Sequence, residues 1–101
     1  MVKKSDFIEI QNSIALTLNN ISYEQYEEAK KNIKLAIEKL LAIRKSVAGD
    51  KEDTATLFDV DLVGITLGKA FTLLKKKPDS LMIKTHLEEA IETLKKIQRR
   101  L

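Results

Sequence analysis

The fold is decided by residues 26–47, which read YEEAKKNIKLAIEKLLAIRKSV. Apolar side chains recur in this stretch at alternating spacings of three and four residues, at Tyr26, Ala29, Ile33, Ala36, Leu40, Ile43 and Val47. This period places them on one face of an α-helix and fits no β-strand. Ser22 and Gln25 have the pattern of a capping box, and Gly49 suits a helix end in the left-handed conformation. We therefore predict a helix from about residue 23 to 48 whose apolar face packs against other helices.

The last and first parts of the chain show the same helical period. In the last part its members are Ile83, Leu87, Ala90, Leu94, Ile97 and Leu101. Pro78 breaks the helix before this segment, and Asp79 or Ser80 can cap the new helix. In the first part, a shorter helix over about residues 5–19 is predicted from Phe7, Ile10, Ile14 and Leu18.

The segment between the helix predicted over residues 23–48 and the last helix carries two apolar stripes. The stripe predicted to face the core consists of Leu57, Val60, Gly64, Leu67, Phe71 and Leu74. Thr56 and Asp59 fit a second capping box at its start. The second stripe consists of Phe58, Leu62, Ile65 and Leu73, lies roughly opposite the first, and is interrupted by Lys69. Gly64 and Gly68 form a Gly-x-x-x-Gly pattern, which is typical of a close contact between two helices.

These four segments predict an all-α fold. Because only a few residues join them, sequential helices must lie antiparallel. Sustained three-four spacing favours shallow crossing angles near 20°. We predict an up-down-up-down four-helix bundle with a shorter first helix, forming a single domain over residues 1–101. The alternative is a three-helix bundle with the first helix docked at an angle.

The composition excludes several classes of function. The chain contains no cysteine, so it has no disulfide, no thiolate metal site and no cysteine nucleophile. The most apolar window, residues 57–74, contains Asp59, Asp61 and Lys69, each of which is costly at a bilayer centre, so we expect no membrane span. The start of the sequence lacks the apolar run of a secretory signal, which makes a cytoplasmic location the expectation.

Catalytic and metal-binding patterns are also missing from the sequence. His86 is the single histidine, and a di-iron site in a helical bundle needs two Glu-x-x-His motifs, whereas residue 83 is isoleucine. Its position beside the apolar stripe predicts an ordinary boundary residue. The glutamates alternate with lysines at helical spacing, which is typical of a solvated helix face. We expect a protein that is not an enzyme and that holds no cofactor or metal.

Basic residues suggest a second function. The net charge is +3 and the pI is about 9.1. The clustered cations are Lys75, Lys76 and Lys77 at one end of the predicted bundle and Lys95, Lys96, Arg99 and Arg100 at the other. No aromatic residue alternates with these cations, so this pattern supplies no aromatic side chain for stacking on nucleic-acid bases. An accessory nucleic-acid binder that contacts phosphates through these clusters is an alternative.

Apolar surface gives the main functional hypothesis. A first helix of about 15 residues spans only about 23 Å, so it leaves one end of the longer helices uncovered. A contiguous apolar patch on a protein surface marks an interaction site. We expect a protein-interaction module, a homodimer or a chain that docks to a partner protein, with its interface at Phe58, Leu62, Ile65, Leu73, Leu41 and Val47. The other reading is that the 49–56 loop or bent helices cover this surface.

In length, basicity and helix count the chain is similar to bacteriocin immunity proteins, which are small cytoplasmic four-helix bundles. The likeness is one of fold and no residue motif carries it, and a shared fold does not confer function. It implies a monomer that recognises a membrane-associated partner, which is a third alternative.

Overall fold

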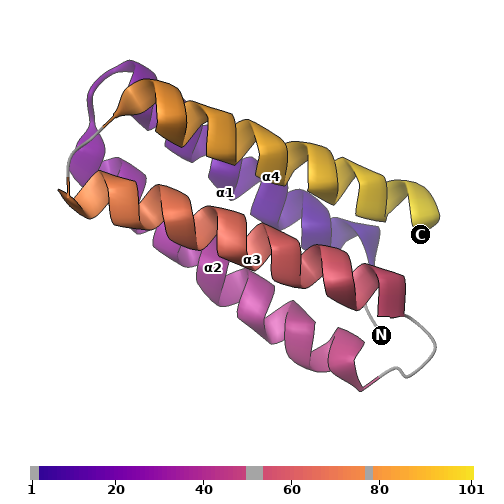
Figure 1. Cartoon of the computed structure of the whole chain (residues 1–101). Coiled ribbons are helices and arrows are strands. Elements are labelled where there is room, and N and C mark those ends of the chain that lie inside the picture. Colours follow the sequence, from indigo (N-terminus) through magenta and orange to yellow (C-terminus); the bar gives the residue numbers. More distant parts are fainter. Residues whose placement is uncertain (1–2, 50–53, 77–78) are drawn as a thin grey trace.

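The structure, a computed structural model, describes residues 3–49, 54–76 and 79–101. Over these residues it contains four α-helices: α1 (Lys4–Ser22), α2 (Tyr26–Ala48), α3 (Thr54–Lys76) and α4 (Ser80–Arg100). Each helix packs against its neighbours in sequence, and α1 also packs against α4, which closes the ring (Figure 1). The predicted all-α four-helix bundle is confirmed.

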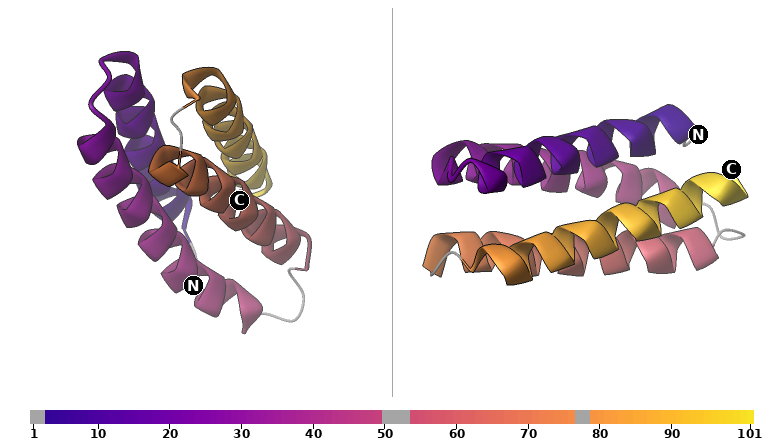
Figure 2. Two further views of the ribbon diagram at one scale, coloured as in Figure 1. Left: turned by 60° about the vertical axis from the view of Figure 1, so that its left-hand side comes forward. Right: turned by 90° about the horizontal axis from the view of Figure 1, so that it is seen from above.

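The bundle is two helical hairpins packed side by side. The α1–α2 hairpin forms one layer and the α3–α4 hairpin the other (Figure 2). The whole measures 41 × 21 × 19 Å, so its length is close to the roughly 35 Å of a 23-residue helix. The start of α1, the end of α2, the start of α3 and the end of α4 therefore meet at one end of the bundle (Figure 1).

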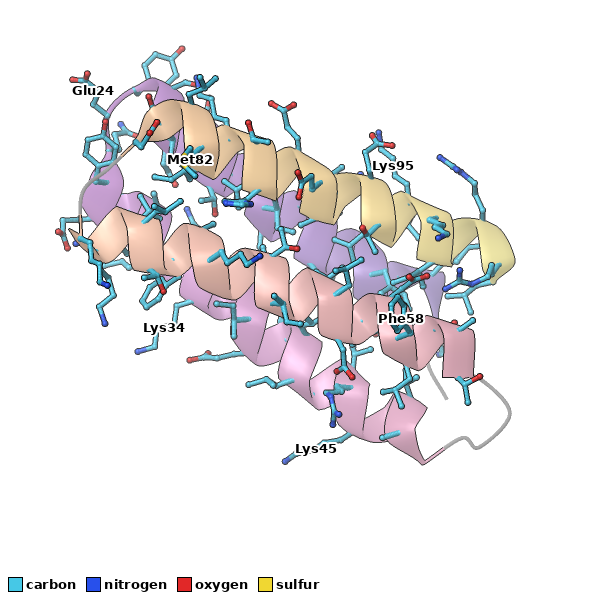
Figure 3. The ribbon with its side chains drawn as sticks, viewed as in Figure 1. Glu24, Lys34, Lys45, Phe58, Met82 and Lys95 are labelled. Atoms are coloured by element: carbon cyan, nitrogen blue, oxygen red, sulfur yellow. The ribbon has the colours of Figure 1, made fainter. Side chains whose placement is uncertain are left out.

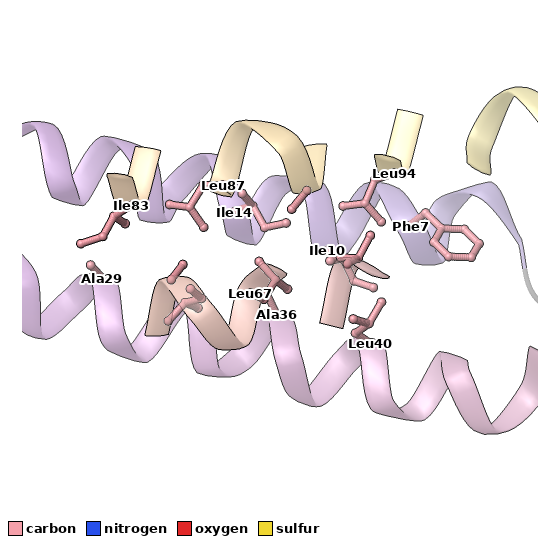
Figure 4. Packing of buried hydrophobic residues seen from close by; sticks show 14 of the residues in the cluster. Phe7, Ile10, Ile14, Ala29, Ala36, Leu40, Leu67, Ile83, Leu87 and Leu94 are labelled. Carbon is pink, nitrogen blue, oxygen red and sulfur yellow. The ribbon is translucent and has the colours of Figure 1, made fainter. Parts of the chain in front are cut away.

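The core follows the predicted stripes of α2 and α4 closely. Fully buried side chains from all four helices meet along the axis (Figure 4), among them Ile10, Ile14, Ala29, Ile33, Ala36, Leu40, Leu67, Ile83, Leu87 and Leu94. Along α2, small alanines alternate with Ile33 and Leu40, so large side chains from the facing helices fit between them. Tyr26 and Ile43, at the two ends of the α2 stripe, are half-buried and pack against this core.

The turn between α1 and α2 differs from its prediction. Ser22 is the last residue of α1, and Gln25 precedes α2 without a side-chain capping bond, so the predicted capping box is wrong. The chain reverses instead at Glu24, whose φ of 57° is left-handed. Asn20 links both helices, because its amide donates to Gln25 at 3.0 Å and its carbonyl accepts from Asn32 at 2.7 Å.

Two further helix ends were predicted incorrectly and one correctly. Gly49 has a φ of −76°, so it closes α2 in the right-handed conformation. α3 begins at Thr54, so Thr56 and Asp59 lie inside the helix and the predicted capping box does not mark its start. Both residues are buried. Asp79 caps α4 as predicted, its carboxylate accepting a hydrogen bond from the backbone of Met82 at 3.2 Å. Pro78 and Lys77 lie outside the described residues.

α3 buries a different face from the one predicted. Its buried residues are Thr56, Asp59, Val60, Val63, Thr66, Leu67, Ala70 and Leu74, whereas Leu57, Gly64 and Phe71 are only half-buried. The reason is that α3 packs between α2 and α4, so the face between these two neighbours is the one that points to the core. Three polar residues, Thr56, Asp59 and Thr66, occupy that face. A prediction from apolar periodicity alone leaves them out, so it placed the buried face too far towards α2.

Candidate interaction surface

Large apolar side chains cover the outer side of α3. Phe58, Leu62 and Ile65 follow one another at spacings of four and three residues, and their exposed fractions are 69%, 42% and 58%. Figure 3 labels Phe58 near the Thr54 end of α3. On neighbouring α2, Leu41 is 55% exposed. We call these four residues, Leu41, Phe58, Leu62 and Ile65, the apolar face.

A groove runs between α2 and α3 beside the apolar face. Its volume is about 420 Å³. The residues that line it are Ile37, Leu40, Leu41 and Arg44 from α2, and Val60, Asp61, Gly64 and Ile65 from α3. A Cβ added at Gly64 would lie 3.5 Å from Leu40 Cδ2, an ordinary contact distance, so the glycine leaves a methyl-sized space in the groove. Leu41 and Ile65, one from each helix, line the groove and belong to the apolar face.

Two opposite charges in the groove bind each other. Nε of Arg44 donates a hydrogen bond to Oδ1 of Asp61 at 2.5 Å, with both side chains about half exposed. This hydrogen bond and the charge of the carboxylate raise the pKa of Arg44, so the guanidinium stays charged throughout the physiological range. Arg44 and Asp61 are the charged residues among those that line the groove. Its charges are therefore balanced, and the rest of its lining is apolar.

Two residues predicted for the interface lie elsewhere. Val47 is buried, so it is unavailable to a partner. Leu73 is half-buried and packs against the core. The prediction assumed a first helix of about 15 residues that leaves this end open, whereas α1 has 19 residues. Sequence reasoning also missed the groove, although the spacing of Ile37, Leu41 and Arg44 places them on one flank of α2.

The predicted cation clusters lie at opposite ends of the bundle. Lys75 and Lys76 end α3, whereas Lys95, Lys96, Arg99 and Arg100 end α4 (Figure 1). Several of these cations contact groups of this chain: Arg100 binds Asp59, Lys95 pairs with Glu92 at 3.7 Å, and Lys75 lies 5.4 Å from the ring centre of Phe71. Lys4, Lys95, Gln98 and Arg99 line an open depression of about 310 Å³. The cations therefore do not form one continuous basic surface along the bundle.

A further depression lies on the surface of α4. His86 is half-buried and lines a depression of about 190 Å³ with Leu81, Met82 and Thr85. In the part of the chain that the structure describes, no three acidic or histidine side chains gather as metal ligands do. Within the same described residues, none of the four helices has both the length and the apolar character that a membrane crossing requires.

Comparisons with protein-family models, with curated proteins and with solved structures find no match to this chain. The described surface carries four exposed large apolar side chains on α2 and α3, the apolar face, beside the α2–α3 groove.

Proposed function

We propose that the chain is a non-enzymatic helical interaction module that binds a protein surface through the apolar face. The observation that carries this proposal is the exposure of Leu41, Phe58, Leu62 and Ile65 on two adjacent helices. Fully burying a side chain of this kind is worth about 1.5–3 kcal/mol. Even partial coverage of four of them favours docking by several kcal/mol before the cost of association.

The chemistry around the apolar face supports binding rather than catalysis. Arg44 and Asp61 are engaged with each other, so the groove presents no separate acid, base or nucleophile. The apolar side chains supply the favourable burial, and the ion pair together with Lys69 forms a polar rim. Such a rim excludes wrong partners and sets the orientation of the right one.

Site-specific photo-crosslinking in the native host tests this proposal. A photoreactive residue replaces Phe58 or Ile65, which belong to the apolar face, or Thr85 or Glu88, which are exposed on α4. We expect adducts from positions 58 and 65 that resist nuclease and give a defined protein mass. The two α4 positions are matched controls and should give no adduct of that mass.

The result that would overturn the proposal is an absence of protein adducts from positions 58 and 65, or equal adducts from all four positions. An adduct that nuclease removes would support contact with nucleic acid instead. Circular dichroism of each variant verifies that the helical content is unchanged, so a missing adduct cannot come from unfolding.

A further inference from the structure

We infer that the α2–α3 groove binds a small neutral amphiphile, a molecule with a short aliphatic chain and a terminal hydroxyl group. The inference goes beyond the interaction module, because it requires the groove alone and no protein partner. Sites for small molecules are concave and mostly apolar, contain a few polar groups at fixed positions, and have volumes of about 300–1,000 Å³. The groove has a volume of about 420 Å³, and one ion pair supplies the charged groups of an otherwise apolar lining.

The hollow lies where Gly64 interrupts a row of large side chains. Leu57, Gly64 and Phe71 are seven residues apart on α3, and residues at this spacing lie on nearly the same flank of a helix. All three are half-buried, and Gly64 lies beside Leu40 of α2. A leucine one heptad before and a phenylalanine one heptad after fill this flank of α3. At Gly64 the flank has no side chain, and the space stays open.

Packing inside the chain does not require a glycine at this position. A Cβ added at Gly64 would lie 3.5 Å from Cδ2 of Leu40, which is an ordinary contact distance. Glycine is also the poorest helix former after proline, so alanine would fit and would favour the helix. The consequence of the glycine for the folded chain is therefore the open space itself.

The ion pair lies at one end of the groove. Arg44 pairs with Asp61, and Leu40 lies beside Gly64, so the two helices run antiparallel past each other. Ile37 lines the other end, seven residues before Arg44 and about 10 Å away along α2. An alkyl chain of about eight carbons has a similar length, because its C–C bonds of about 1.5 Å follow a zigzag. Its chain can lie along the apolar lining with its polar end at the ion pair.

The ion pair favours a neutral end group. Nε of Arg44 donates to Oδ1 of Asp61, which uses one of the five N–H donors of the guanidinium. Within the described part of the chain, neither side chain makes a further hydrogen bond. A hydroxyl group can donate to the second oxygen of Asp61 and accept from Arg44. A carboxylate would instead lie beside the charge of Asp61, and an ammonium group beside that of Arg44.

Methyl NMR titration with 1-octanol, octanoate and octylammonium tests the inference, because these three probes share one chain and differ in the charge of the end group. We expect 1-octanol to bind with a dissociation constant of about 1 mM or lower, and the two charged probes to bind about fivefold more weakly. The methyl signals expected to shift are those of Ile37, Leu40, Leu41, Val60 and Ile65.

Leu16 is the matched control for this titration. It lies on α1 and is 55% exposed, the same fraction as Leu41 in the groove. Shifts at Leu16 as large as those at Leu41 would show adsorption to any exposed apolar side chain and would overturn the inference. So would an absence of shifts in the groove, or a charged probe that binds as tightly as 1-octanol.

Gly64→Leu should remove the site without unfolding the chain. The new side chain fills the hollow, as Leu57 fills the equivalent position one heptad earlier, so binding of 1-octanol should weaken by about tenfold or more. The melting temperature should not fall, because leucine is a better helix former than glycine. Gly64→Ala adds a single methyl at an ordinary contact distance and should weaken binding by about threefold.

Gly68→Leu is the control, because Gly68 lies on the same helix but does not line the groove, and a Cβ there would meet nothing within 4 Å. We expect this variant to bind 1-octanol like the wild type. Unchanged binding in Gly64→Leu, or an equal loss in the control, would contradict the proposed site.

Asp61→Asn tests the position of the end group. The change keeps the shape of the side chain and removes its charge, so the positive charge of Arg44 is no longer balanced. Octanoate should then gain about tenfold in affinity and bind more tightly than 1-octanol. If the order of the two probes does not change, the end group does not lie at the ion pair and the inference is wrong.

The two proposals fail separately. Protein adducts from positions 58 and 65 without binding of 1-octanol would leave the interaction module standing and overturn the small-molecule site. Binding of 1-octanol in the groove without protein adducts would do the reverse.

Discussion

Arg100, in the last turn of α4, donates a hydrogen bond from Nη2 to Oδ2 of Asp59 in α3 at 2.6 Å. Asp59 is only 4% exposed, whereas the guanidinium side chain of Arg100 is one-third exposed. A buried carboxylate is tolerated when a charged partner compensates for its lost hydration. This ion pair therefore holds the end of α4 to the early turns of α3, at the end of the bundle where both chain termini lie (Figure 1).

Removing the cation should destabilise the bundle. We expect Arg100→Ala to lower the free energy of unfolding by about 1–3 kcal/mol, because it leaves a buried carboxylate without its charged donor while water reaches the vacated side. Urea denaturation measures the loss. Arg99→Ala is the matched control, since Arg99 is exposed, and should change stability by less than about 0.5 kcal/mol. Equal losses in both variants would show that the ion pair contributes nothing.

Two phenylalanines distinguish the core from the apolar face. Phe7 is fully buried, whereas most of the Phe58 side chain is exposed. We expect Phe7→Ala to lower the free energy of unfolding by about 3–5 kcal/mol, from lost burial and the cavity left behind. Phe58→Ala should cost the monomer less than about 0.5 kcal/mol.

This comparison is made by denaturation at a concentration low enough to keep the chain monomeric, because association adds to apparent stability. A loss at Phe58 as large as that at Phe7 would mean that the Phe58 ring packs within its own chain. The apolar face would then not be available to a partner.

The α4 cap offers a test between two neighbouring residues. The sequence leaves Asp79 and Ser80 as equal candidates, and in the structure Asp79 accepts the bond from Met82. Asp79→Ala should lower the free energy of unfolding by about 1 kcal/mol, whereas Asp79→Asn retains an accepting oxygen and most of the stability. Ser80→Ala should be close to neutral. Thermal denaturation of the three variants shows which residue caps α4. A larger loss of stability in Ser80→Ala than in Asp79→Ala would assign the cap to Ser80.

The sequence predicted α2 and α4 well because each buries an apolar stripe and exposes a charged face. Ile33 and Leu40 in α2, and Leu87 and Leu94 in α4, are buried where the period places them. For such helices the local spacing is enough to predict the buried face, since the core positions are apolar residues at a helical period.

The buried face of α3 could not be predicted from the spacing of apolar residues because part of this face is polar. Asp59 is buried against Arg100, which lies 41 residues away, and no local pattern shows such a partner. Thr66 satisfies its hydroxyl within the helix, donating to the carbonyl oxygen of Leu62 at 2.9 Å. The mutual spacing of Phe58, Leu62 and Ile65 did identify an outward-facing set, whereas the burial of Val47 depends on the length of α1 and on packing between helices.

The turn at Glu24 shows the same limit and gives the last prediction. Ser22 and Gln25 match a capping pattern, but α1 continues to Ser22 and the reversal occurs at Glu24, with a φ of 57°. A side chain in this conformation costs about 1 kcal/mol that glycine avoids. Glu24→Gly should therefore raise the free energy of unfolding by about 0.5 kcal/mol, after the larger chain entropy of glycine is subtracted.

Lys34→Gly is the control for this change, because Lys34 is exposed in the middle of α2 and its backbone is helical (Figure 3). There the same substitution should lower the free energy of unfolding by about 1 kcal/mol. Guanidinium denaturation measures the change in the free energy of unfolding of each variant. We expect the two changes to have opposite signs, which a systematic error shared by both measurements cannot produce. If Glu24→Gly also destabilises the chain, the strain relieved at this residue is smaller than the chain entropy that glycine adds to the unfolded state, and the prediction is wrong.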